Sequence, residues 1–454
     1  MSEHRLVLRD IDIPDIEGIT KYRSRGGYEG TRRALTEFSP QQTLEEVESS
    51  KLQGRGGSWS NVADKWRLMP PATGDVAAGE RYLVVNGYES DPGVFRDRKL
   101  MERLPHRLID GAIIAAYALQ AEVIYVCLPT DMRRAVRALE VAVTEAREQG
   151  WLGRDIRGSG FDVDIRIHAG GNAHITGEET ALLNSLEGRR PEPRPRPLIP
   201  THHELFGRPA LVHNAGTLAY LPDILVFGSA AFRQVGSRRC PGTLVLCVSG
   251  HVRRPGLYEV EIGSLTVRQL VKDLAGGMAA GSRLKAVLPG GLASQVLKPS
   301  ELDVVLNPHA LSGSGGADAV ANSSFGNGAV VVMDKTTCMV RTALTIMEFY
   351  AAESCGACTP CREGAPWLLD VLRRIEAGSG NSGDIDTIRS VTGQIAPPSG
   401  SPAMCGFAPA FATGVGGILS AFGSEFDDHI DGNHGCSFAA VEDIRVPESV
   451  HLRY

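Results

Sequence analysis

The chain contains three cysteines spaced three residues apart, Cys355, Cys358 and Cys361, in the run Glu353-Ser-Cys-Gly-Ala-Cys-Thr-Pro-Cys-Arg-Glu-Gly364. A [4Fe–4S] cluster needs four thiolates that converge from different directions, and one C-x-x-C-x-x-C turn can supply three of them. Gly356 favours the bend that such a turn needs. The spacing therefore predicts most of the ligand set of an iron–sulfur cluster.

The fourth thiolate must come from elsewhere, because no further cysteine follows Cys361 closely. Cys405, in Met404-Cys-Gly406, lies between two predicted helices of the same C-terminal region and is the preferred candidate. Cys436, in the loop Asn433-His-Gly-Cys436, is the alternative.

Other uses of cysteine compete with this interpretation. A structural zinc site usually takes its cysteines as two separated pairs, and a redox dithiol needs a single C-x-x-C pair. Radical enzymes built on three cysteines use a different first spacing and leave one iron open. The regular triplet with a distant fourth cysteine favours a four-cysteine cluster.

Composition limits the class of protein. The chain has 454 residues, 43% of them hydrophobic, which is enough for roughly three domains. A formal charge of -6, with no strongly basic half, argues against nucleic acid as a partner. No stretch approaches about 18 apolar residues, so no membrane span is expected. The N-terminus lacks a hydrophobic segment behind a basic one, so no secretory signal is expected.

The cysteines as a whole indicate the redox compartment. They are nine, an odd number, and three form the ligand-like triplet. This usage predicts free thiols in a reducing compartment, and hence a cytoplasmic location. Cys127 and Cys247 lie in apolar strand-like runs and are expected to be small buried hydrophobes. No role is assigned to Cys240, Cys338 or, apart from the alternative above, Cys436.

Four regions separate along the chain, and the second is predicted to be a parallel α/β domain. Residues 1–62 are polar with helical content, and the glycine-rich run Gly54-Arg-Gly-Gly57 lies near their end. Residues 63–238 alternate between strand and helix patterns, which indicates a parallel sheet covered by helices. The expected elements are strands at 82–86 and 123–127 and helices at 108–121 and 132–149.

The other two regions are predicted to be a small α+β domain and a helical bundle. Residues 239–328 contain strand patterns at 242–250, 257–262 and 284–288 and a helix near 267–274, and they end in a glycine- and serine-rich loop. Residues 329–454 are helical, with Trp367, Leu368, Val371, Leu372 and Ile375 at helical spacing after the triplet. A bundle that holds the cluster between helix ends is the economical arrangement.

Several long motifs occur in an order that is specific for one family. They are Gly54-Arg-Gly-Gly57 with Lys65-Trp66, Asp91-Pro-Gly93, Phe95-Arg-Asp-Arg98, Pro105-His-Arg-Leu-Ile-Asp-Gly111, Gly177-Glu-Glu-Thr-Ala-Leu182, Asn184-Ser-Leu-Glu-Gly188, Ser249-Gly-His-Val252, Arg254-Pro-Gly256 and the cysteine triplet. Over nearly its whole length the chain resembles the 51-kDa flavoprotein, or F, subunit of NADH:quinone oxidoreductase (complex I). It is also similar to the related diaphorase subunits of hydrogenases and formate dehydrogenases.

The resemblance implies a complete electron path. A Rossmann-like α/β domain would bind FMN and NADH, the third region would be an SLBB-type β-grasp domain, and the bundle would carry the [4Fe–4S] cluster. Hydride from NADH would reduce FMN, because NADH releases two electrons together, a cluster accepts one, and a flavin can handle either. The expected partners are a small iron–sulfur subunit and a larger multi-cluster subunit, and any membrane attachment would run through them.

The resemblance also implies which residues would contact the cofactors. Glycines in the first motif would let backbone amides approach the flavin closely, and Lys65 would neutralise a phosphate or hydrogen-bond the ring. No catalytic side chain is assigned. The expected cofactor-binding set is Gly54, Arg55, Gly56, Gly57, Lys65, Asn86, Glu89, Asp91, His174, Gly177, Glu178, Glu179, His213, Asn214 and Thr217.

The departures from the family pattern are concentrated at the expected nucleotide pocket. Ser60, Leu68 and Ile199 stand where the family has phenylalanines that hold the adenine, and Arg196 replaces a lysine. Stacking on an aromatic ring contributes about 1–3 kcal/mol per base in nucleic-acid systems, so three losses would weaken dinucleotide binding by several powers of ten. Trp59 is placed to restore one ring from a neighbouring position.

The flavin side departs less from the family. Tyr88 replaces an acid, His213 an asparagine, and His174 the tyrosine before Gly-Glu-Glu. FMN is therefore expected, whereas NAD(H) is left open. We adopt an NADH-oxidising flavoprotein subunit as the first hypothesis. The second is an electron-relay subunit that keeps the cluster but takes electrons from another donor, and the third is a structural or assembly paralogue.

Overall fold

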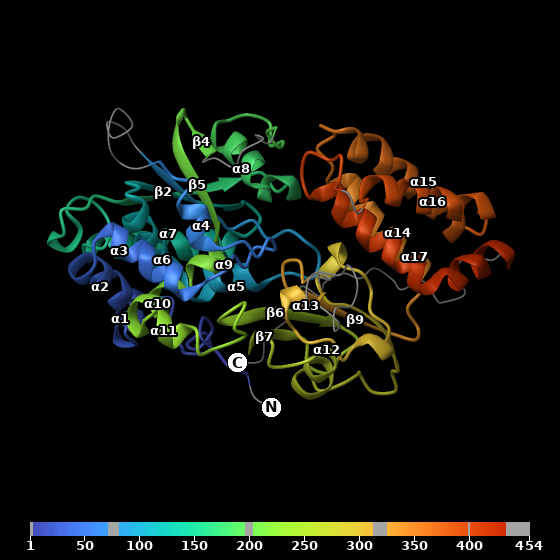
Figure 1. The fold of residues 1–454 in the computed structure, drawn as a ribbon, viewed down its shortest axis with the longest axis horizontal. Coiled ribbons are helices and arrows are strands. Elements are labelled where there is room, and N and C mark those ends of the chain that lie inside the picture. The colour runs from blue at the N-terminus through green and yellow to red at the C-terminus, as the bar shows by residue number, and fades with distance from the viewer. Residues whose placement is uncertain (1–2, 71–80, 196–202, 312–324, 398–399, 433–454) are drawn as a thin grey trace.

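Figure 1 shows the chain in a computed structural model that describes residues 3–70, 81–195, 203–311, 325–397 and 400–432. A large α/β part, coloured blue to green, lies beside a smaller sheet in yellow-green and yellow, and a helical bundle in orange to red forms a separate lobe. The predictions that concern Arg196, Ile199 and Cys436 fall outside the described residues.

A five-stranded sheet in the order β3-β2-β1-β5-β4 forms the centre of the α/β part. Its strands are β1 (Tyr82–Asn86), β2 (Val123–Pro129), β3 (Asp164–Gly170), β4 (His203–Leu205) and β5 (Arg208–Asn214). β4 pairs antiparallel with β5, and the other pairs are parallel. Four residues of the central β1 are buried, which explains its continuous apolar run. Asn86 and Asn214 are partners in the register, so β1 and β5 end at the same edge.

Helices cover this sheet and position the loops at its edge. They are α5 (Arg96–Arg103), α6 (Pro105–Leu119), α7 (Arg133–Glu148), α8 (Glu179–Leu186), α9 (Ala215–Leu218), α10 (Leu221–Phe227) and α11 (Ser229–Phe232). α6 is buried on nearly all sides because it lies between the sheet and the N-terminal helices. A Cβ at Gly111 would lie 2.0 Å from the carbonyl oxygen of Leu218, so glycine is required for the close packing of α6 on α9.

The N-terminal region packs on the α/β part. It contains α1 (Ile19–Ser24), α2 (Glu29–Glu37), α3 (Pro40–Ser50) and α4 (Val62–Trp66). α3 begins with a capping box between Ser39 and Gln42, and Pro40 occupies its first position. The apolar side chains of this region and of the α/β part form one continuous core.

The second sheet has four strands in the order β7-β6-β9-β8. They are β6 (Thr243–Gly250), β7 (Gly256–Glu261), β8 (Leu284–Leu288) and β9 (Ala329–Asp334). β6 and β7 form an antiparallel hairpin, and β9 pairs parallel with β6 and antiparallel with β8. α12 (Val267–Gln269) continues into a π-helical turn, η4 (Leu270–Leu274), and α13 (Pro308–Leu311) follows. The strand β9 belongs to the second sheet but lies beyond the boundary predicted at residue 328. The boundary was placed before this apolar run because the run directly precedes a helix.

The C-terminal lobe is a bundle with its own core. It consists of α14 (Met339–Ala352), the π-helical turn η7 (Pro360–Gly364), α15 (Ala365–Glu376), α16 (Ser382–Ile395) and α17 (Phe407–Asp431). The apolar residues predicted on α15 are buried with one exception, since Trp367 is 59% exposed.

α17 is the described helix that comes nearest to the length and composition of a membrane span. By length and composition alone, this helix passes the test for crossing a membrane. It packs against α14, α15 and α16, and a Cβ at Gly414 would lie 2.3 Å from the carbonyl oxygen of Leu292. A core helix of a bundle passes the same test, and these contacts explain the small and apolar residues of α17.

Asp110 on α6 holds the N-terminal region through a set of buried hydrogen bonds. Its carboxylate accepts the hydroxyl of Tyr22 at 2.9 Å, the N–H of Tyr28 at 2.8 Å, and both the N–H (3.2 Å) and the hydroxyl (2.6 Å) of Thr31. The side chain is almost completely buried. If the carboxylate is removed, these buried donors cannot form hydrogen bonds with solvent water instead.

We therefore expect Asp110→Ala to lower the free energy of unfolding by roughly 3 kcal/mol or more, because each buried donor that loses its acceptor costs about 1–3 kcal/mol. Asp110→Asn keeps one acceptor oxygen and should lose less. Urea unfolding followed by tryptophan fluorescence measures both effects. An Asp110→Ala variant with the wild-type midpoint and slope would contradict this role.

Candidate functional site

The glycine-rich loop lies against the carboxyl end of β5. Gly57 has a φ of +109°, a conformation that strains any other residue. A Cβ at Gly56 would lie 2.9 Å from the Cβ of Asn214, so a side chain there would push the loop away from the strand. The N–H of Arg55 donates to the hydroxyl of Thr217 at 2.8 Å. The loop is thus held by its backbone against the turn between β5 and α9.

The side chain of Arg55 anchors the loop to the second sheet. Its guanidinium donates to the carbonyls of Gln53 at 2.9 Å, Pro241 at 2.8 Å and Thr243 at 3.2 Å. The guanidinium carbon also lies 5.3 Å from the ring centroid of Trp59, within range of a cation–π contact. Arg55 is therefore occupied by the protein, and so is one face of the Trp59 ring.

The expected nucleotide pocket has no phenylalanine at Ser60 or Leu68, the two described positions where the family pattern has one. Ser60 is exposed, and its carbonyl accepts the N–H of Gly54 at 2.8 Å, which closes the glycine loop. Leu68 is half-buried. The indole nitrogen of Trp59 is buried without a hydrogen-bond partner. The chain does not present a stacking ring at the two described positions where the family pattern has phenylalanine.

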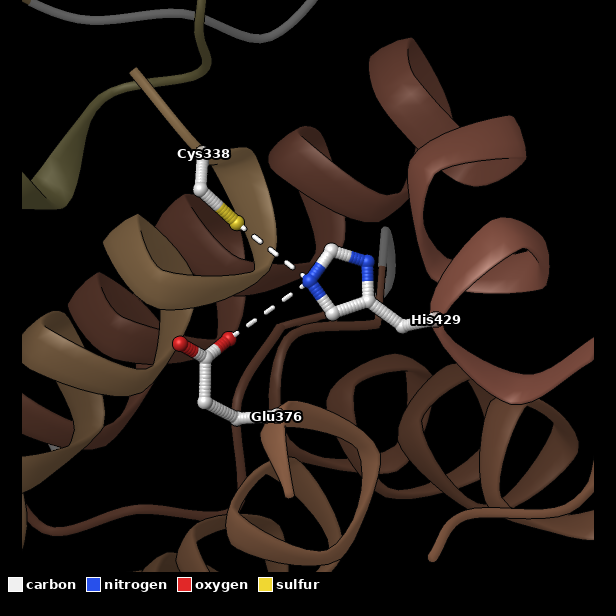
Figure 2. Close-up of side chains that lie close together, drawn as sticks. All are labelled: Cys338, Glu376 and His429. Carbon is white, nitrogen blue, oxygen red and sulfur yellow. Dashed lines mark hydrogen bonds and ion pairs between the residues drawn. The ribbon is translucent and has the colours of Figure 1, made fainter. Parts of the chain in front are cut away.

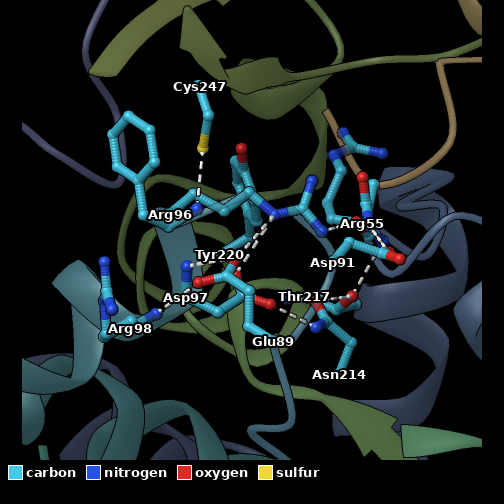
Figure 3. Close-up of polar contacts among 12 residues, drawn as sticks. Arg55, Glu89, Asp91, Arg96, Asp97, Arg98, Asn214, Thr217, Tyr220 and Cys247 are labelled. Carbon is cyan, nitrogen blue, oxygen red and sulfur yellow. Dashed lines mark hydrogen bonds and ion pairs between the residues drawn. The ribbon is translucent and has the colours of Figure 1, made fainter. Parts of the chain in front are cut away.

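A buried charge network supports the loop (Figure 3). The carboxylate of Glu89 accepts the N–H groups of Asp97 at 3.0 Å and Arg98 at 2.8 Å, at the start of α5. The guanidinium of Arg96 lies 3.3 Å from the carboxylate of Asp97 and 3.9 Å from that of Glu89. Arg96 also donates to the backbone carbonyl of Arg55. The network fixes the glycine loop relative to α5.

The same network reaches the end of β5. Burial, followed by the negative charge of Asp97, raises the pKa of Glu89 to about 7. The carboxylate of Asp97 accepts a hydrogen bond from the amide of Asn214, and the N–H of Asp97 donates to Glu89. Asp97 therefore joins two predicted site residues, Glu89 and Asn214. Arg96 and Asp97 were not among the predicted site residues. The run Phe95-Arg-Asp-Arg98, which places charges directly after a turn and before a helix, was the signal that could have identified them.

Asn86 joins the end of β1 to the η3–α8 segment. Its amide donates to the carbonyl of Gly177, in η3 (His174–Gly177), at 2.7 Å, and its oxygen accepts the N–H of Tyr88 at 3.0 Å. A Cβ at Gly170 would lie 2.4 Å from the hydroxyl of Tyr88, and one at Gly177 would lie 3.2 Å from its Cβ. Tyr88, which replaces an acid, therefore fits because glycines flank it on two sides.

Two further predicted residues are engaged in a polar cluster beside α8. Lys65 forms an ion pair with Glu179, and His203 Nε2 lies 3.2 Å from the other carboxylate oxygen. Burial opposes ionisation, but the hydrogen bond to His203 and the charge of Lys65 lower the pKa of Glu179 to about 2. The Lys65 ammonium is thus neutralised within the protein.

His213 is a buried neutral histidine. The indole N–H of Trp66 donates to its Nε2 at 2.6 Å. Burial, reinforced by the positive charge of Lys65, lowers the pKa of His213 to about 3. The ring therefore acts as a hydrogen-bond acceptor near neutral pH.

A cavity of about 440 Å³ opens between the three parts of the chain. This volume lies within the range of about 300–1,000 Å³ that is typical of small-molecule sites. The residues around it come from the glycine loop, the turn before α5, the loops beside β8 and β9, and the start of α17. They are Gly56, Gly57, Asp91, Gly290, Leu292, Ala293, Gly326, Asn327, Gly406, Pro409, Ala410 and Thr413. The cavity therefore extends from the glycine loop to the residues that follow Cys405.

His174 connects the cavity wall with the helical bundle. Its Nε2 lies 3.5 Å from the carboxylate of Asp91, and its backbone N–H donates to the carboxylate of Glu353 at 2.7 Å. Its ring centroid lies 5.4 Å from that of Phe349 and 5.5 Å from that of Phe407. Asp91 also accepts from the amide of Asn327. His174 thus lies between a wall of the cavity and both segments that carry the predicted cluster cysteines.

The four predicted cluster cysteines come together from two segments. Cys355 and Cys358 lie in the turn after α14, Cys361 in η7, and Cys405 directly before α17. Burial, followed by repulsion from the other three cysteines, raises the pKa of the Cys361 thiol to about 12. The pKa of Cys405 is raised to about 11 by burial first, with further repulsion that includes Cys355 and Cys358.

The donor set of these cysteines suits an iron–sulfur cluster. Four neighbouring thiolates repel one another and need positive charge beside them, and soft sulfur ligands favour iron–sulfur clusters among metal centres. Gly356 has a φ of +72° and supplies the predicted bend. Contacts with the α/β part come from Arg190, which donates to the carbonyl of Cys355 at 2.6 Å, and from Glu178, whose charge affects Cys405. Glu178 also caps α8.

Three family descriptions match successive parts of the chain. Residues 47–223 match the Nuo51 FMN-binding domain, residues 245–292 the SLBB domain, and residues 341–429 the NADH-ubiquinone oxidoreductase-F iron-sulfur binding region. They cover the glycine loop with the first sheet, part of the second sheet, and the four cysteines. These matches confirm the predicted fold class.

Similar proteins extend over nearly the whole chain. The chain is 42% identical over 426 residues to the second F subunit of the NADH-quinone oxidoreductase of Rhizobium meliloti, covering 94% of this chain and 97% of that protein. It is 38% identical over 424 residues to the F subunit of the NADH-quinone oxidoreductase of Escherichia coli, covering 93% and 92%. A crystal structure of NAD+-reducing [NiFe]-hydrogenase in the H2-reduced state matches with a TM-score of 0.78 and 28% identity, over 96% of this chain and 68% of that chain.

The buried neutral state of His213 makes stability depend on pH. The unfolded chain binds a proton there near the ordinary pKa of about 6.5, whereas the folded chain resists protonation down to about 3. This group therefore contributes stability above pH 6.5 that is lost as the pH falls towards 3. Between pH 6.5 and pH 5.5 the loss is roughly 1 kcal/mol.

His213→Asn removes the titrating group, so the variant should not lose this stability. When the pH is lowered from 6.5 to 5.5, the unfolding free energy of the wild type should therefore fall by roughly 1 kcal/mol more than that of the variant. Urea unfolding at the two pH values measures it. His251→Asn, at a histidine whose side chain is 45% exposed, is the matched control. Parallel pH profiles for wild type and His213→Asn would contradict a buried neutral His213.

Proposed function

This chain belongs to the family of the F subunit of NADH-quinone oxidoreductase, and on that premise we propose that it is the electron-input subunit of a complex I-like or diaphorase-type assembly. It is an oxidoreductase subunit with FMN and a [4Fe–4S] cluster. Electrons enter as a hydride from NADH and leave singly through the cluster.

One observation carries the proposal beyond family membership. The cavity is bounded by Gly56 and Gly57 at one end and by Gly406 and Pro409 at the other, next to Cys405. A flavin in this space would contact the backbone of the glycine loop and lie close to the cluster. Such proximity is what transfer of single electrons between the two groups requires.

The residues around the cavity have distinct roles in the proposal. FMN supplies the exchange between two-electron and one-electron steps when it is bound. The glycine loop presents backbone N–H groups to the cofactor without side chains in the way. Asp91, held by Asn327 and His174, supplies a polar wall, whereas Leu292 and Ala410 line the apolar side and exclude water.

The electron-relay function is the second candidate, favoured by the described part of the nucleotide pocket. Ser60 and Leu68 offer no aromatic ring there, and one face of Trp59 is covered by Arg55. In that case FMN and the cluster are kept, but the donor is not NADH. The two candidates differ in whether NADH reduces the bound flavin.

We further propose a small iron–sulfur subunit and a larger multi-cluster subunit as the partners. A cluster that accepts one electron at a time needs an external acceptor close by. Trp367 is 59% exposed in the first turn of α15, directly after the turn that holds Cys361, and exposed aromatic residues are enriched at protein interfaces. Attachment to a membrane would run through these partners.

Anaerobic stopped-flow mixing of the FMN-loaded protein with NADH should bleach the visible absorbance of the flavin within seconds, because hydride transfer reduces the flavin. NADPH and dithionite serve as comparisons, since dithionite reduces the flavin whatever the donor site. Bleaching by dithionite, but by neither nucleotide, would reject NADH oxidation and leave the electron-relay function.

Cys358→Ser should remove most of the bound iron and the paramagnetic signal of the reduced cluster, because a four-thiolate cluster loses one ligand. FMN content should stay near wild type, since the glycine loop is far from this change in sequence and shares no ligand with it. Cys127→Ala, at a buried cysteine of β2, is the control and should keep its iron. Wild-type iron content in both Cys358→Ser and Cys405→Ser would contradict the proposed ligand set.

A further inference from the structure

A second group of potential metal ligands lies at the end of the bundle opposite the cluster cysteines. Cys338 is the N-cap residue of α14, Glu376 is the last residue of α15, and His429 lies in the last turn of α17 (Figure 2). One sulfur, one oxygen and one nitrogen from these side chains all lie within 4.8 Å of one another. None of the three residues has a role in the electron path.

The hydrogen bonding of His429 leaves one ring nitrogen for a ligand. Nδ1 lies 2.7 Å from the backbone carbonyl oxygen of Glu425, and a carbonyl can only accept, so Nδ1 carries the proton. Nε2 then has its lone pair towards Cys338 and Glu376, and without a metal it accepts from the Cys338 thiol at 3.5 Å. This arrangement, with one nitrogen hydrogen-bonded to a carbonyl and the other towards a metal, is the usual one for a metal-binding histidine.

Of the other two donor atoms, Cys338 Sγ accepts the N–H of Arg341 at 3.4 Å, whereas the Glu376 carboxylate has an unsatisfied oxygen. Glu376 Oε2 is buried and makes no hydrogen bond, and it lies 3.8 Å from His429 Nε2, which is too long for one. The side chain of Glu376 is 15% exposed, and Cys338 and His429 are 5% and 7% exposed. Burial raises the pKa of Glu376, while His429 and Arg341 oppose that rise. A cation between the three donors would neutralise the buried carboxylate.

The distances agree with a zinc ion. Bonds of about 2.3 Å to sulfur and about 2.0 Å to nitrogen at a tetrahedral angle place those two atoms roughly 3.5 Å apart. Cys338 Sγ lies 3.5 Å from His429 Nε2. Sulfur, imidazole and carboxylate are also a ligand set that zinc accepts, whereas calcium and magnesium prefer oxygen alone.

We propose that Cys338, Glu376 and His429 form a zinc site that ties the ends of α14, α15 and α17 together. Zinc has no redox chemistry in proteins, so the site stabilises the bundle and takes no part in electron transfer. The 14 residues of α14 separate it from Cys355 by about 21 Å at 1.5 Å per residue. The fourth coordination position is available to water.

The location gives the site a mechanical role at a domain junction. Cys338 follows β9 after three residues, so the clip attaches the bundle where the chain leaves the second sheet. Glu425, next to the site on α17, accepts the N–H of Met339 at 3.0 Å and pairs with Lys285 of β8 at 2.6 Å. Zinc would join the start of α14 to α15 and α17 at the same point, beside the ion pair that connects α17 to the sheet.

The test uses the full chain with FMN and its iron–sulfur cluster in place, dialysed against Zn²⁺ alone. We expect one zinc per chain by elemental analysis. Zinc K-edge X-ray absorption should give one sulfur neighbour at about 2.3 Å and nitrogen or oxygen neighbours at about 2.0 Å. Four sulfur neighbours would mean zinc in the cluster cysteines and would overturn the proposal. A zinc content below one-tenth per chain, with normal iron content, would overturn it too.

Variants identify the ligands. His429→Ala and Cys338→Ser should bind zinc at least about 100-fold more weakly, since even changes in the residues that orient metal ligands cost about 10–100-fold. Glu376→Gln, a conservative change of similar shape, should weaken zinc binding in the same direction without unfolding the bundle. Iron content, FMN content and far-UV circular dichroism should stay at wild-type values.

Glu348→Gln is the matched control, because Glu348 on α14 influences Glu376 electrostatically but contributes no donor atom. It should bind zinc as the wild type does. Zinc should also raise the melting temperature of the wild type and of this control, but not of Glu376→Gln. Wild-type zinc affinity in both His429→Ala and Glu376→Gln would overturn the proposal, whatever the properties of the electron path.

Discussion

The buried contact of Arg96 with Glu89 and Asp97 is the constraint on which the cofactor end of the structure depends. Charges this deeply buried are tolerated only when nearly every lone pair and N–H group has a partner, because desolvation costs several kcal/mol per ion. The partners here are the start of α5, the carbonyl of Arg55 and the amide of Asn214. Satisfying the charges therefore positions the glycine loop, the helix and the end of β5 at once.

Two residues that depart from the family pattern, Tyr88 and His213, are each accommodated by their immediate neighbours without a change in this charge network. Tyr88 requires the missing side chains of Gly170 and Gly177, and His213 requires the indole N–H of Trp66. Each replacement is accommodated by contacts within the α/β part and leaves the charge network intact. The flavin side can therefore carry these replacements while the loop that faces the cavity keeps its position.

Much of the fold was predictable because long apolar runs and helical spacing are local signals. The strands β1 and β2, the helices α6 and α7, and the amphipathic α15 appear near their predicted bounds. β3 and β5 were not predicted, since β3 alternates at a partly exposed edge and β5 begins with an arginine and a proline. Residues 329–334, which form β9, were included in the helical region because strand pairing between distant segments leaves no mark on local sequence.

The site shows the same division between local and distant signals. The glycine loop and the cysteine triplet are compact motifs, and the sequence indicates their chemistry directly. The grouping of Cys338, Glu376 and His429 depends on the ends of three helices that are far apart in the chain, so no spacing rule could identify it. The anchoring of Arg55 by distant carbonyls escaped the sequence for the same reason, because backbone acceptors carry no residue identity.

The path of the chain from Asn327 through β9 and α14 to Cys355 has a consequence for the rate of electron transfer. Asn327 lines the cavity, β9 is hydrogen-bonded on both sides within the second sheet, and α14 lies in the core of the bundle. The cavity wall and the cluster are thus joined by two stiff elements in direct succession. On the proposed function, this connection would hold a flavin in the cavity and the cluster at one separation, on which the rate of electron tunnelling depends steeply.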